Sequence, residues 1–393
     1  GNCRACMVEI EGEGVLAASC IRKPTNSMKV KTSSEKAKKS RELVFELLLA
    51  DQPKKEIAHD NNSDFWKWIE KVEVKESRFP KKTSCQADVS HPSMAVNLDA
   101  CIQCNLCVRA CREVQVNDVI GMAYRGENSK IVFDFDDPMG DSTCVACGEC
   151  VQACPTGALM PASIVDKDGV GHSKVDKKID SVCPYCGVGC QIEYNVKDNK
   201  IKYVNGVDGP ANKNRLCVKG RFGFDYVNNP ERLTKPLIRI KDKPKDLHPS
   251  INFSNIHEYF REASWDEALD YAAQGFLKLK KQRNGKSNLA GFGSAKCSNE
   301  EAYLFQKLIR TGFNTNNVDH CTRLCHASSV AALLETIGSG AVTAPFYEVE
   351  HSDVIIVIGA NPTENHPVAA TFFKNAAKTV SYTHLTLPTR LSV

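Results

Sequence analysis

The sequence has no long apolar run. Among its 393 residues, of which 42% are hydrophobic, the longest strongly apolar stretch is 354–360. That is far shorter than the roughly 18 residues that a membrane helix needs, so we expect no direct membrane span. The net charge is only +4, and the lysine-rich stretch 29–39 is typical of a solvated face. The sequence therefore gives little reason to expect a nucleic-acid partner.

Cysteine is absent between Cys20 and Cys85, but elsewhere it is abundant, with 19 residues gathered mostly in short runs. Disulfide scaffolds are usually short secreted chains, and a CxxC pair spans too tight a loop for a typical structural disulfide. The cysteine pattern therefore favours metal or cluster ligation in a globular chain of several domains.

Two runs repeat one spacing, with gaps of two, two and three residues. They are Cys101, Cys104, Cys107, Cys111 and Cys144, Cys147, Cys150, Cys154, the second followed by Pro155. This is the spacing of bacterial dicluster ferredoxins, in which the fourth cysteine of each run binds the other cluster. We thus predict two [4Fe-4S] clusters, with Cys154 completing the first and Cys111 the second. The alternative is a pair of zinc sites, which more often use knuckles a dozen or more residues apart.

A third run has a different spacing and a remote last member. It consists of Cys183, Cys186, Cys190 and Cys217, with Gly187 and Gly189 able to curl the backbone close to a cluster. It predicts a separate third [4Fe-4S] cluster. A zinc knuckle is the alternative.

The first cysteines of the chain, Cys3, Cys6 and Cys20, number only three. A [2Fe-2S] cluster needs four ligands, so we expect the fourth upstream of Gly1, where an export signal could also lie. A redox-active or zinc-binding CxxC is the alternative. The strand-like residues 7–10 and the turn at Gly12 and Gly14 fit a small β-rich ferredoxin.

In this order the segments resemble the alpha subunit of molybdopterin-dependent formate dehydrogenases, whose front half also resembles the large iron-sulfur subunit of respiratory NADH dehydrogenase. The resemblance covers residues 1–378 and implies a multidomain α+β and α/β fold. It implies a partial [2Fe-2S] ferredoxin domain (1–33), a helical segment (34–92), a dicluster ferredoxin domain (93–165), a molybdopterin oxidoreductase [4Fe-4S] domain (176–234) and a partial α/β molybdopterin-binding domain (235–380). We expect residues 381–393 to be a non-native tail.

The most specific part of the resemblance is the segment 317–330. It implies that Cys325 binds molybdenum or tungsten, that His326 is catalytic, and that Lys219 lies between a cluster and the pterin. A buried core cysteine beside a surface histidine, and a plain surface lysine, are the alternatives. Cys321 has no role in the pattern and is expected to be structural.

Residues 353–358 predict a fully buried parallel strand that runs into a Gly/Asn/Pro loop. The resemblance places the guanine-dinucleotide arm of the pterin here, with Gly359, Asn361 and Glu364 as its contacts. A generic strand and loop is the alternative. Capping-box spacing at Ser298 and Glu301 predicts a helix, and apolar positions over 265–276 predict another, both with faces in the core.

Relatives in this family place a further cluster, held by one histidine and three cysteines, in the helical segment. Here the corresponding stretch offers Gln52, Glu56 and His59 and no cysteine. Gln52 and Glu56 are poor cluster ligands and His59 cannot hold a cluster alone, so we predict that this chain has no cluster there.

The function that the resemblance implies is oxidation of formate to CO2, or the reverse, at a Mo- or W-bis(molybdopterin guanine dinucleotide) centre. Electrons would leave through the three [4Fe-4S] clusters and the [2Fe-2S] cluster to another subunit or carrier, by way of an NAD-linked diaphorase, ferredoxin or quinone, in the cytoplasm. The chain by itself is expected to be inactive. The alternatives are a cysteine-ligated nitrate reductase and a non-catalytic electron-transfer subunit of a respiratory complex.

Overall fold

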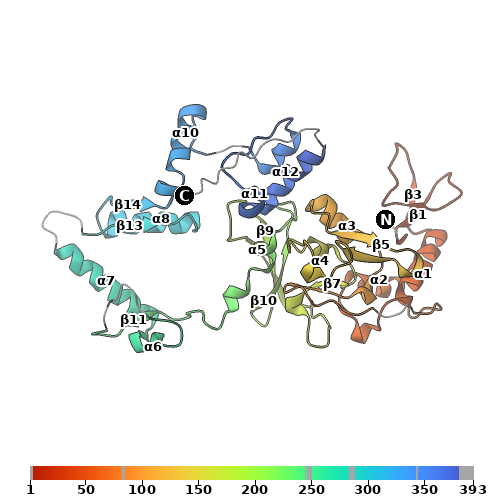
Figure 1. Cartoon of the computed structure of the whole chain (residues 1–393), viewed down its shortest axis with the longest axis horizontal. Coiled ribbons are helices and arrows are strands. Elements are labelled where there is room, and N and C mark those ends of the chain that lie inside the picture. Colours follow the sequence, from red (N-terminus) through yellow and green to blue (C-terminus); the bar gives the residue numbers. More distant parts are fainter. Residues whose placement is uncertain are drawn as a thin grey trace. The chain divides into compact units, whose positions relative to one another are not determined.

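A computed structural model describes residues 3–81, 85–243, 245, 250–282, 288–341 and 344–379. The chain forms two compact units, Gly1–Asp225 with Pro345–Val393, and Tyr226–Ala344. Each unit is described by itself below (Figure 1). The predicted tail 381–393 lies outside the described residues. In the described ranges, no helix is long and apolar enough to cross a membrane.

The first unit begins with a small antiparallel sheet in the order β2-β1-β3, built from β1 (Met7–Ile10), β2 (Ala17–Ala18) and β3 (Val30–Lys31). The predicted strand at 7–10 is thus confirmed. Helices α1 (Glu35–Ala50) and α2 (Asp64–Val72) follow, and the Ser34 hydroxyl accepts from the backbone N–H of Ala37 to cap α1. Phe45, Phe65 and Trp66 form their shared core.

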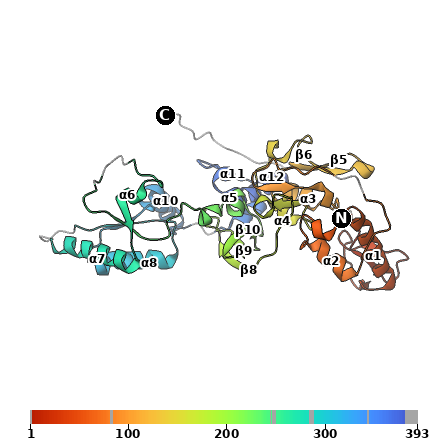
Figure 2. The ribbon, with the colours of Figure 1, turned by 90° about the horizontal axis from the view of Figure 1, so that it is seen from below.

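The next region places two short helices between two strand pairs. β4 (Met94–Val96) pairs with β7 (Leu159–Pro161), and β5 (Ile120–Ala123) pairs with β6 (Lys130–Phe133), both antiparallel. Helices α3 (Leu106–Arg109) and α4 (Glu149–Ala153) carry cysteines of the first two runs, and α3 continues into a π-helical turn, Ala110–Val114. Figure 2 shows the β5–β6 hairpin beside α3. Cys107, Cys111 and Cys150 belong to the core of this region.

A three-stranded antiparallel sheet in the order β10-β9-β8 completes the ordered part of residues 1–225. Its strands are β8 (Lys177–Val182), β9 (Gln191–Lys197) and β10 (Lys200–Gly206), and α5 (Val218–Phe222) follows. The sheet contributes Ile192 and Val204 to a hydrophobic core, and helix α12 (Pro367–Thr379), far later in the chain, packs on that core through Val368 and Ala369 (Figure 1). This core therefore joins segments that are remote in sequence.

The second unit holds two small sheets and several helices. β11 (Leu237–Arg239) and β12 (Phe260–Glu262) are antiparallel, whereas β13 (Gly291–Gly293) and β14 (Val318–His320) are parallel. The helices are α6 (Ile256–Tyr259), α7 (Trp265–Lys281), α8 (Asn299–Lys307), α9 (Thr322–Cys325) and α10 (Ala327–Ile337). The capping box of Ser298 and Glu301 at the start of α8 is confirmed.

The prediction that the apolar face of α7 lies in the core is wrong. The helix forms, but Trp265 and Leu269 are 68% and 61% exposed. The apolar face predicted for the helix after Ser298 is only partly buried, since Ile309 is buried while Leu308 is 49% exposed. The described residues of this unit gather only a small core, around Leu289, Ile309 and Phe313, so they cannot cover both apolar faces.

The predicted buried strand at 353–358 is also wrong. The segment follows the 3-10 helix Phe346–His351 and leads into α11 (Pro362–Asn365), and Val354 and Ile358 are 62% and 65% exposed. A parallel strand needs hydrogen-bonded neighbours and two covered faces. Among the described residues, no named strand is paired with this segment.

Candidate functional site

Cysteines of the first two runs surround a small pocket, which we call site A. It is lined by Cys101, Cys104, Cys107 and, from the second run, Cys154. The structure thus brings together the four side chains that the spacing groups, including the exchanged fourth member. Ligation of a cluster by these thiols remains a prediction.

The complementary group, site B, consists of Cys144, Cys147, Cys150 and Cys111. Burial raises the pKa of Cys150 far above its usual value, and the nearby thiols of Cys147, Cys144, Cys107 and Cys111 add to the rise. Burial also raises the pKa of Cys144, with Cys111 as a further contributor. These four thiols therefore lie close enough to repel one another as thiolates.

The third run forms site C, a small cavity lined by Cys183, Cys186, Cys190 and Cys217. Pro367 and Val368, at the start of α12, line the same cavity. Burial raises the pKa of Cys183, and the charge of Lys219, on the first turn of α5, opposes the rise. Lys219 thus lies near site C, and its place between a cluster and the pterin remains a prediction.

The backbone repeats its geometry around sites A and B. The N–H of Gln103 donates to Cys101 Sγ at 3.4 Å, and the N–H of Ala146 donates to Cys144 Sγ at 3.3 Å. Both donors have a positive φ, 52° and 53°. In each run the backbone thus directs an N–H at the sulfur of the first cysteine, a contact that would stabilise negative charge on that sulfur.

The chemistry of the three sites suits a polynuclear metal group. Burial raises the pKa of Cys147 and of Cys190 to about 12, so these thiols would be neutral near pH 7 without a cation to replace the proton. A bound metal deprotonates its thiol ligands outright. Over the ranges that the structure describes, no three His, Cys, Asp or Glu side chains converge on a point that could hold a single ion. Four thiols around a cavity, as at sites A and C, fit an iron-sulfur cluster.

Cys3, Cys6 and Cys20 line one larger cavity, which Cys104 of site A also lines. The N–H of Ser19 donates to the Cys6 carbonyl at 3.1 Å, which holds the β1–β2 pair closed next to these thiols. Burial opposes ionisation of Cys6, but hydrogen bonds from Cys20 and Ser19 outweigh it and lower the pKa of Cys6. The structure therefore brings the three thiols together beside site A.

In the second unit, Cys325 and His326 follow the carboxyl end of β14. Cys325 is the last residue of α9 and is exposed among the described residues. His326 directly precedes α10. The Ala295 N–H, in the segment after β13, donates to Cys321 Sγ at 3.3 Å, consistent with a structural role for Cys321. The pair thus lies where loops follow parallel strands, a common place for ligand sites.

Gly359, Asn361 and Glu364 belong to the first unit and are exposed. Gly359 has φ +67°, and the Glu364 N–H donates to the Asn361 carbonyl at 3.2 Å in the first turn of α11. Cys325 and His326 belong to the second unit. The predicted pterin contacts remain predictions.

In the helical segment, the residues at the predicted empty cluster position make structural contacts instead. Gln52 is buried, and its amide donates to the Ala100 carbonyl at 3.0 Å, next to Cys101. His59 Nδ1 lies 3.0 Å from the Gly169 carbonyl. Glu56 is exposed. These contacts tie the helical segment to its neighbours, and the absence of a cluster there remains a prediction.

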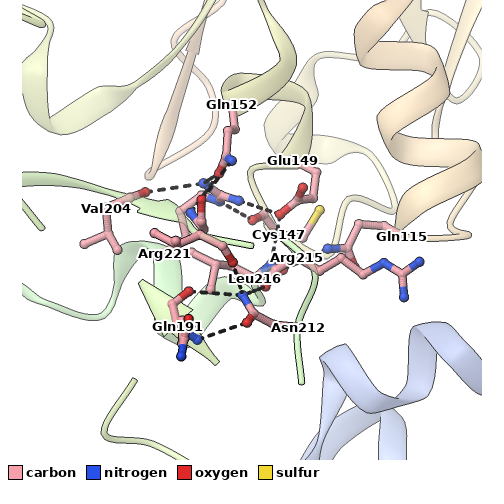
Figure 3. Close-up of polar contacts among 12 residues, drawn as sticks. Gln115, Cys147, Glu149, Gln152, Gln191, Val204, Asn212, Arg215, Leu216 and Arg221 are labelled. Carbon is pink, nitrogen blue, oxygen red and sulfur yellow. Dashed lines mark hydrogen bonds and ion pairs between the residues drawn. The ribbon is translucent and has the colours of Figure 1, made fainter. Parts of the chain in front are cut away.

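Sequence reasoning missed a buried ion pair between Arg221 and Glu149 (Figure 3). Arg221, on α5, is 2% exposed, and Glu149, on α4, is 6% exposed. Arg221 Nε donates to the Cys147 carbonyl at 2.7 Å and Nη1 donates to Gln152 Oε1 at 2.7 Å. Glu149 Oε1 also accepts from the Leu216 N–H at 2.9 Å. The pair therefore links site B to the segment that carries Cys217.

A sequence signal for this pair exists within the repeat. The second run has Gly148-Glu149 between its second and third cysteines, where the first run has Asn105-Leu106. Leu106 is 41% exposed, whereas Glu149 is buried. A carboxylate at a position that becomes buried needs a partner. Comparison of the two runs with each other could therefore have raised the question of what pairs with Glu149.

The exchange of fourth cysteines between the runs can be tested at sites A and B. We expect Cys154→Ser to disturb the cluster of site A while that of site B persists, because Cys154 lines site A although it belongs to the second run. Cys111→Ser should do the reverse. EPR of the reduced protein, with iron and sulfide analysis, would measure this. Loss of the site B signal in Cys154→Ser would show that each run holds its own cluster.

Three segments match known family models. Residues 100–158 match the 4Fe-4S dicluster domain, residues 176–229 the molybdopterin oxidoreductase Fe4S4 domain, and residues 232–384 molybdopterin oxidoreductase. The chain thus contains iron-sulfur domains followed by molybdopterin oxidoreductase sequence, which confirms the resemblance that the cysteine runs suggested.

The chain is similar along most of its length to curated bacterial proteins. It is 32% identical over 417 residues to "Probable oxidoreductase YjgC" of Bacillus subtilis, covering 96% of this chain and 40% of that protein. It is also 32% identical over 420 residues to "Putative formate dehydrogenase YrhE" of the same species, covering 96% and 41%. The chain therefore spans about 40% of the length of the curated relatives it matches. The crystal structure of an NAD+-reducing [NiFe]-hydrogenase matches with 25% identity and a TM-score of 0.37, covering 41% of this chain and 70% of that one.

Proposed function

We propose that this chain, with its iron-sulfur and molybdopterin oxidoreductase domains, is the electron-transfer and metal-ligating part of an enzyme that oxidises formate to CO2 or runs the reverse reaction. The observation that carries the proposal is the exposed Cys325-His326 pair after the parallel strands β13 and β14, in a chain that also has three four-cysteine sites. Relatives that bear the name formate dehydrogenase support the substrate.

Cys325 and His326 would handle the substrate's electrons and proton. Formate loses two electrons and one proton when it becomes CO2. The Cys325 thiolate, a soft ligand, would hold molybdenum or tungsten, which supplies the two-electron acceptor when bound as the bis(molybdopterin guanine dinucleotide) group. His326 would take the proton as a general base. Gly359, Asn361 and Glu364 are proposed to contact the guanine-dinucleotide arm.

Lys219 and the cysteine sites would then carry the electrons away. Lys219 lies close enough to Cys183 to act on its charge, so it can stabilise an electron-rich state at site C. From there, sites B and A lead towards Cys3, Cys6 and Cys20, which share a cavity with Cys104 of site A. We propose that these three thiols hold a [2Fe-2S] cluster and that an NAD-linked diaphorase, ferredoxin or quinone path accepts the electrons.

The test is substrate-dependent dye reduction by the full-length protein together with its molybdenum and tungsten content. We expect formate to reduce a viologen or other dye, and nitrate not to oxidise the reduced dye. Turnover with nitrate alone would favour a cysteine-ligated nitrate reductase. Iron-sulfur clusters without molybdenum or tungsten would favour a non-catalytic electron-transfer subunit.

A further inference from the structure

The Arg221–Glu149 pair is the most deeply buried pair of opposite charges among the described residues, and neither residue has a role in the proposed chemistry. A buried ion pair is weak evidence for stability, because the desolvation of two charges offsets much of their attraction. Such pairs are best attested as devices that specify one arrangement of the parts they join. The parts joined here are the second cysteine run and the segment that carries Cys217.

The contacts of the pair reach the backbone on both sides. On the site B side, Arg221 Nε donates to the carbonyl of Cys147 itself, at 2.7 Å. On the site C side, the Glu149 carboxylate accepts from the Leu216 N–H at 2.9 Å, and the Arg221 N–H donates to the Cys217 carbonyl at 3.0 Å. Figure 3 shows Arg221 between Cys147, Glu149 and Gln152. The Arg221–Cys217 bond is a main-chain bond of α5, so the side chains of the pair join the Cys147 carbonyl to Leu216, the residue before Cys217.

The second run is shaped to admit Arg221. Gly148 has φ +70°, and a Cβ on it would lie 2.1 Å from Arg221 Cδ. Asn105, its counterpart in the first run, has nearly the same backbone, with φ 64° and ψ 10° against 70° and 13°. The positive φ alone therefore does not require glycine, since asparagine adopts it in the first run. Glycine at 148 is required by the close approach of Arg221.

The pair also acts electrostatically on one site. Glu149 and Arg221 both influence the charge of Cys147, with opposite signs. The strongest influences on the thiols of Cys104 and Cys107 in site A are burial, neighbouring thiols and local backbone N–H groups. Neither Glu149 nor Arg221 is among them. The potential of an iron-sulfur cluster depends on nearby net charge and on hydrogen bonds. A balanced pair beside site B therefore adds no net charge there.

We propose that Arg221 and Glu149 are positioning residues that fix site B relative to site C for electron transfer, and that their charge balance sets the reduction potential at site B. The proposal rests on the proposed function in one respect, namely that sites B and C hold clusters. It assigns no chemical step to either residue.

The test compares Glu149→Gln with Arg221→Lys in the cluster-loaded protein. In Glu149→Gln the new amide can still accept from Leu216 and Arg221 but leaves the guanidinium charge unbalanced, so the reduction potential at site B should rise while that at site A changes much less. Arg221→Lys keeps the charge, but an ammonium cannot contact Cys147, Glu149 and Gln152 together. This variant should leave the potential at site B nearly unchanged and alter the magnetic interaction between the reduced clusters of sites B and C.

Potentials come from EPR-monitored redox titration, and the interaction from the EPR spectrum of the fully reduced protein. Glu70→Gln, which removes the same charge from an exposed pair with Lys55, is the matched control and should shift neither site. Equal shifts at sites A and B in Glu149→Gln, or no shift at all, would overturn the charge role. An unaltered interaction in Arg221→Lys would overturn the positioning role. Absence of [4Fe-4S] signals in the unmodified protein would instead refute the proposed function.

Discussion

Replacing Cys325 by alanine is expected to abolish formate-dependent dye reduction by the full-length protein. Loss of a residue that only supports a metal ligand typically costs about 10 to 100-fold, so loss of the ligand itself should cost more than about 100-fold. The thiol of Cys325 is exposed, and among the described residues it makes no side-chain hydrogen bond that this change would break. Fold and cluster content should therefore persist.

Cys321→Ala is the matched control for this prediction, since it removes a thiol from the same segment. Cys321 Sγ accepts a weak hydrogen bond from the Ala295 N–H at 3.3 Å and lies 4.0 Å from His320 Nδ1. Formate oxidation in Cys321→Ala should stay within a few-fold of the unmodified protein. Equal activities in the unmodified protein and Cys325→Ala would remove Cys325 from the mechanism.

The second large effect is a loss of folding stability, expected when Arg221 is replaced. Arg221→Met leaves the Glu149 carboxylate buried without its partner, which typically destabilises a protein by about 3–5 kcal/mol. The double variant Arg221→Met/Glu149→Gln removes both charges, so it should recover most of that loss. Urea titration that follows the visible absorbance of the clusters would compare the midpoints. A double variant no more stable than Arg221→Met would contradict this account.

The control for Arg221 is the exposed pair of Arg109 and Glu113 near the first run. Arg109→Met should cost no more than about 1 kcal/mol, because exposed ion pairs contribute little. A loss in Arg109→Met as large as that in Arg221→Met would mean that burial is not the cause.

The sequence predicted the parts of the site that depend on local spacing. The exchange of Cys154 into site A followed from the gaps within the runs, and the structure brings that side chain to the cavity. It could not reveal the Arg221–Glu149 pair, because those residues are 72 positions apart and nothing in a single sequence states which segments meet. Only the difference between Gly148-Glu149 and Asn105-Leu106 carried a hint.

Elements were easier to predict than their surroundings. The helix at 265–281 forms because its local pattern favours it, and the Ser264 hydroxyl caps it by accepting from the Glu267 N–H at 3.1 Å. Burial of its apolar face needs other segments, and the described residues leave Trp265 exposed. The strand at 353–358 failed for the same reason, since a strand exists only with neighbours.

Helix α12 gives the assembly of site C a particular timing. Val368 lines the site C cavity, Arg215 Nη1 donates to Thr371 Oγ1 across 156 positions, and Lys374 donates to Asn117 across 257. On a ribosome, the cysteines of sites A and B emerge long before this wall does. Domains generally fold in the order of synthesis, so the thiols of sites A and B can come together before residue 367 emerges, whereas the site C cavity gains its last wall only afterwards.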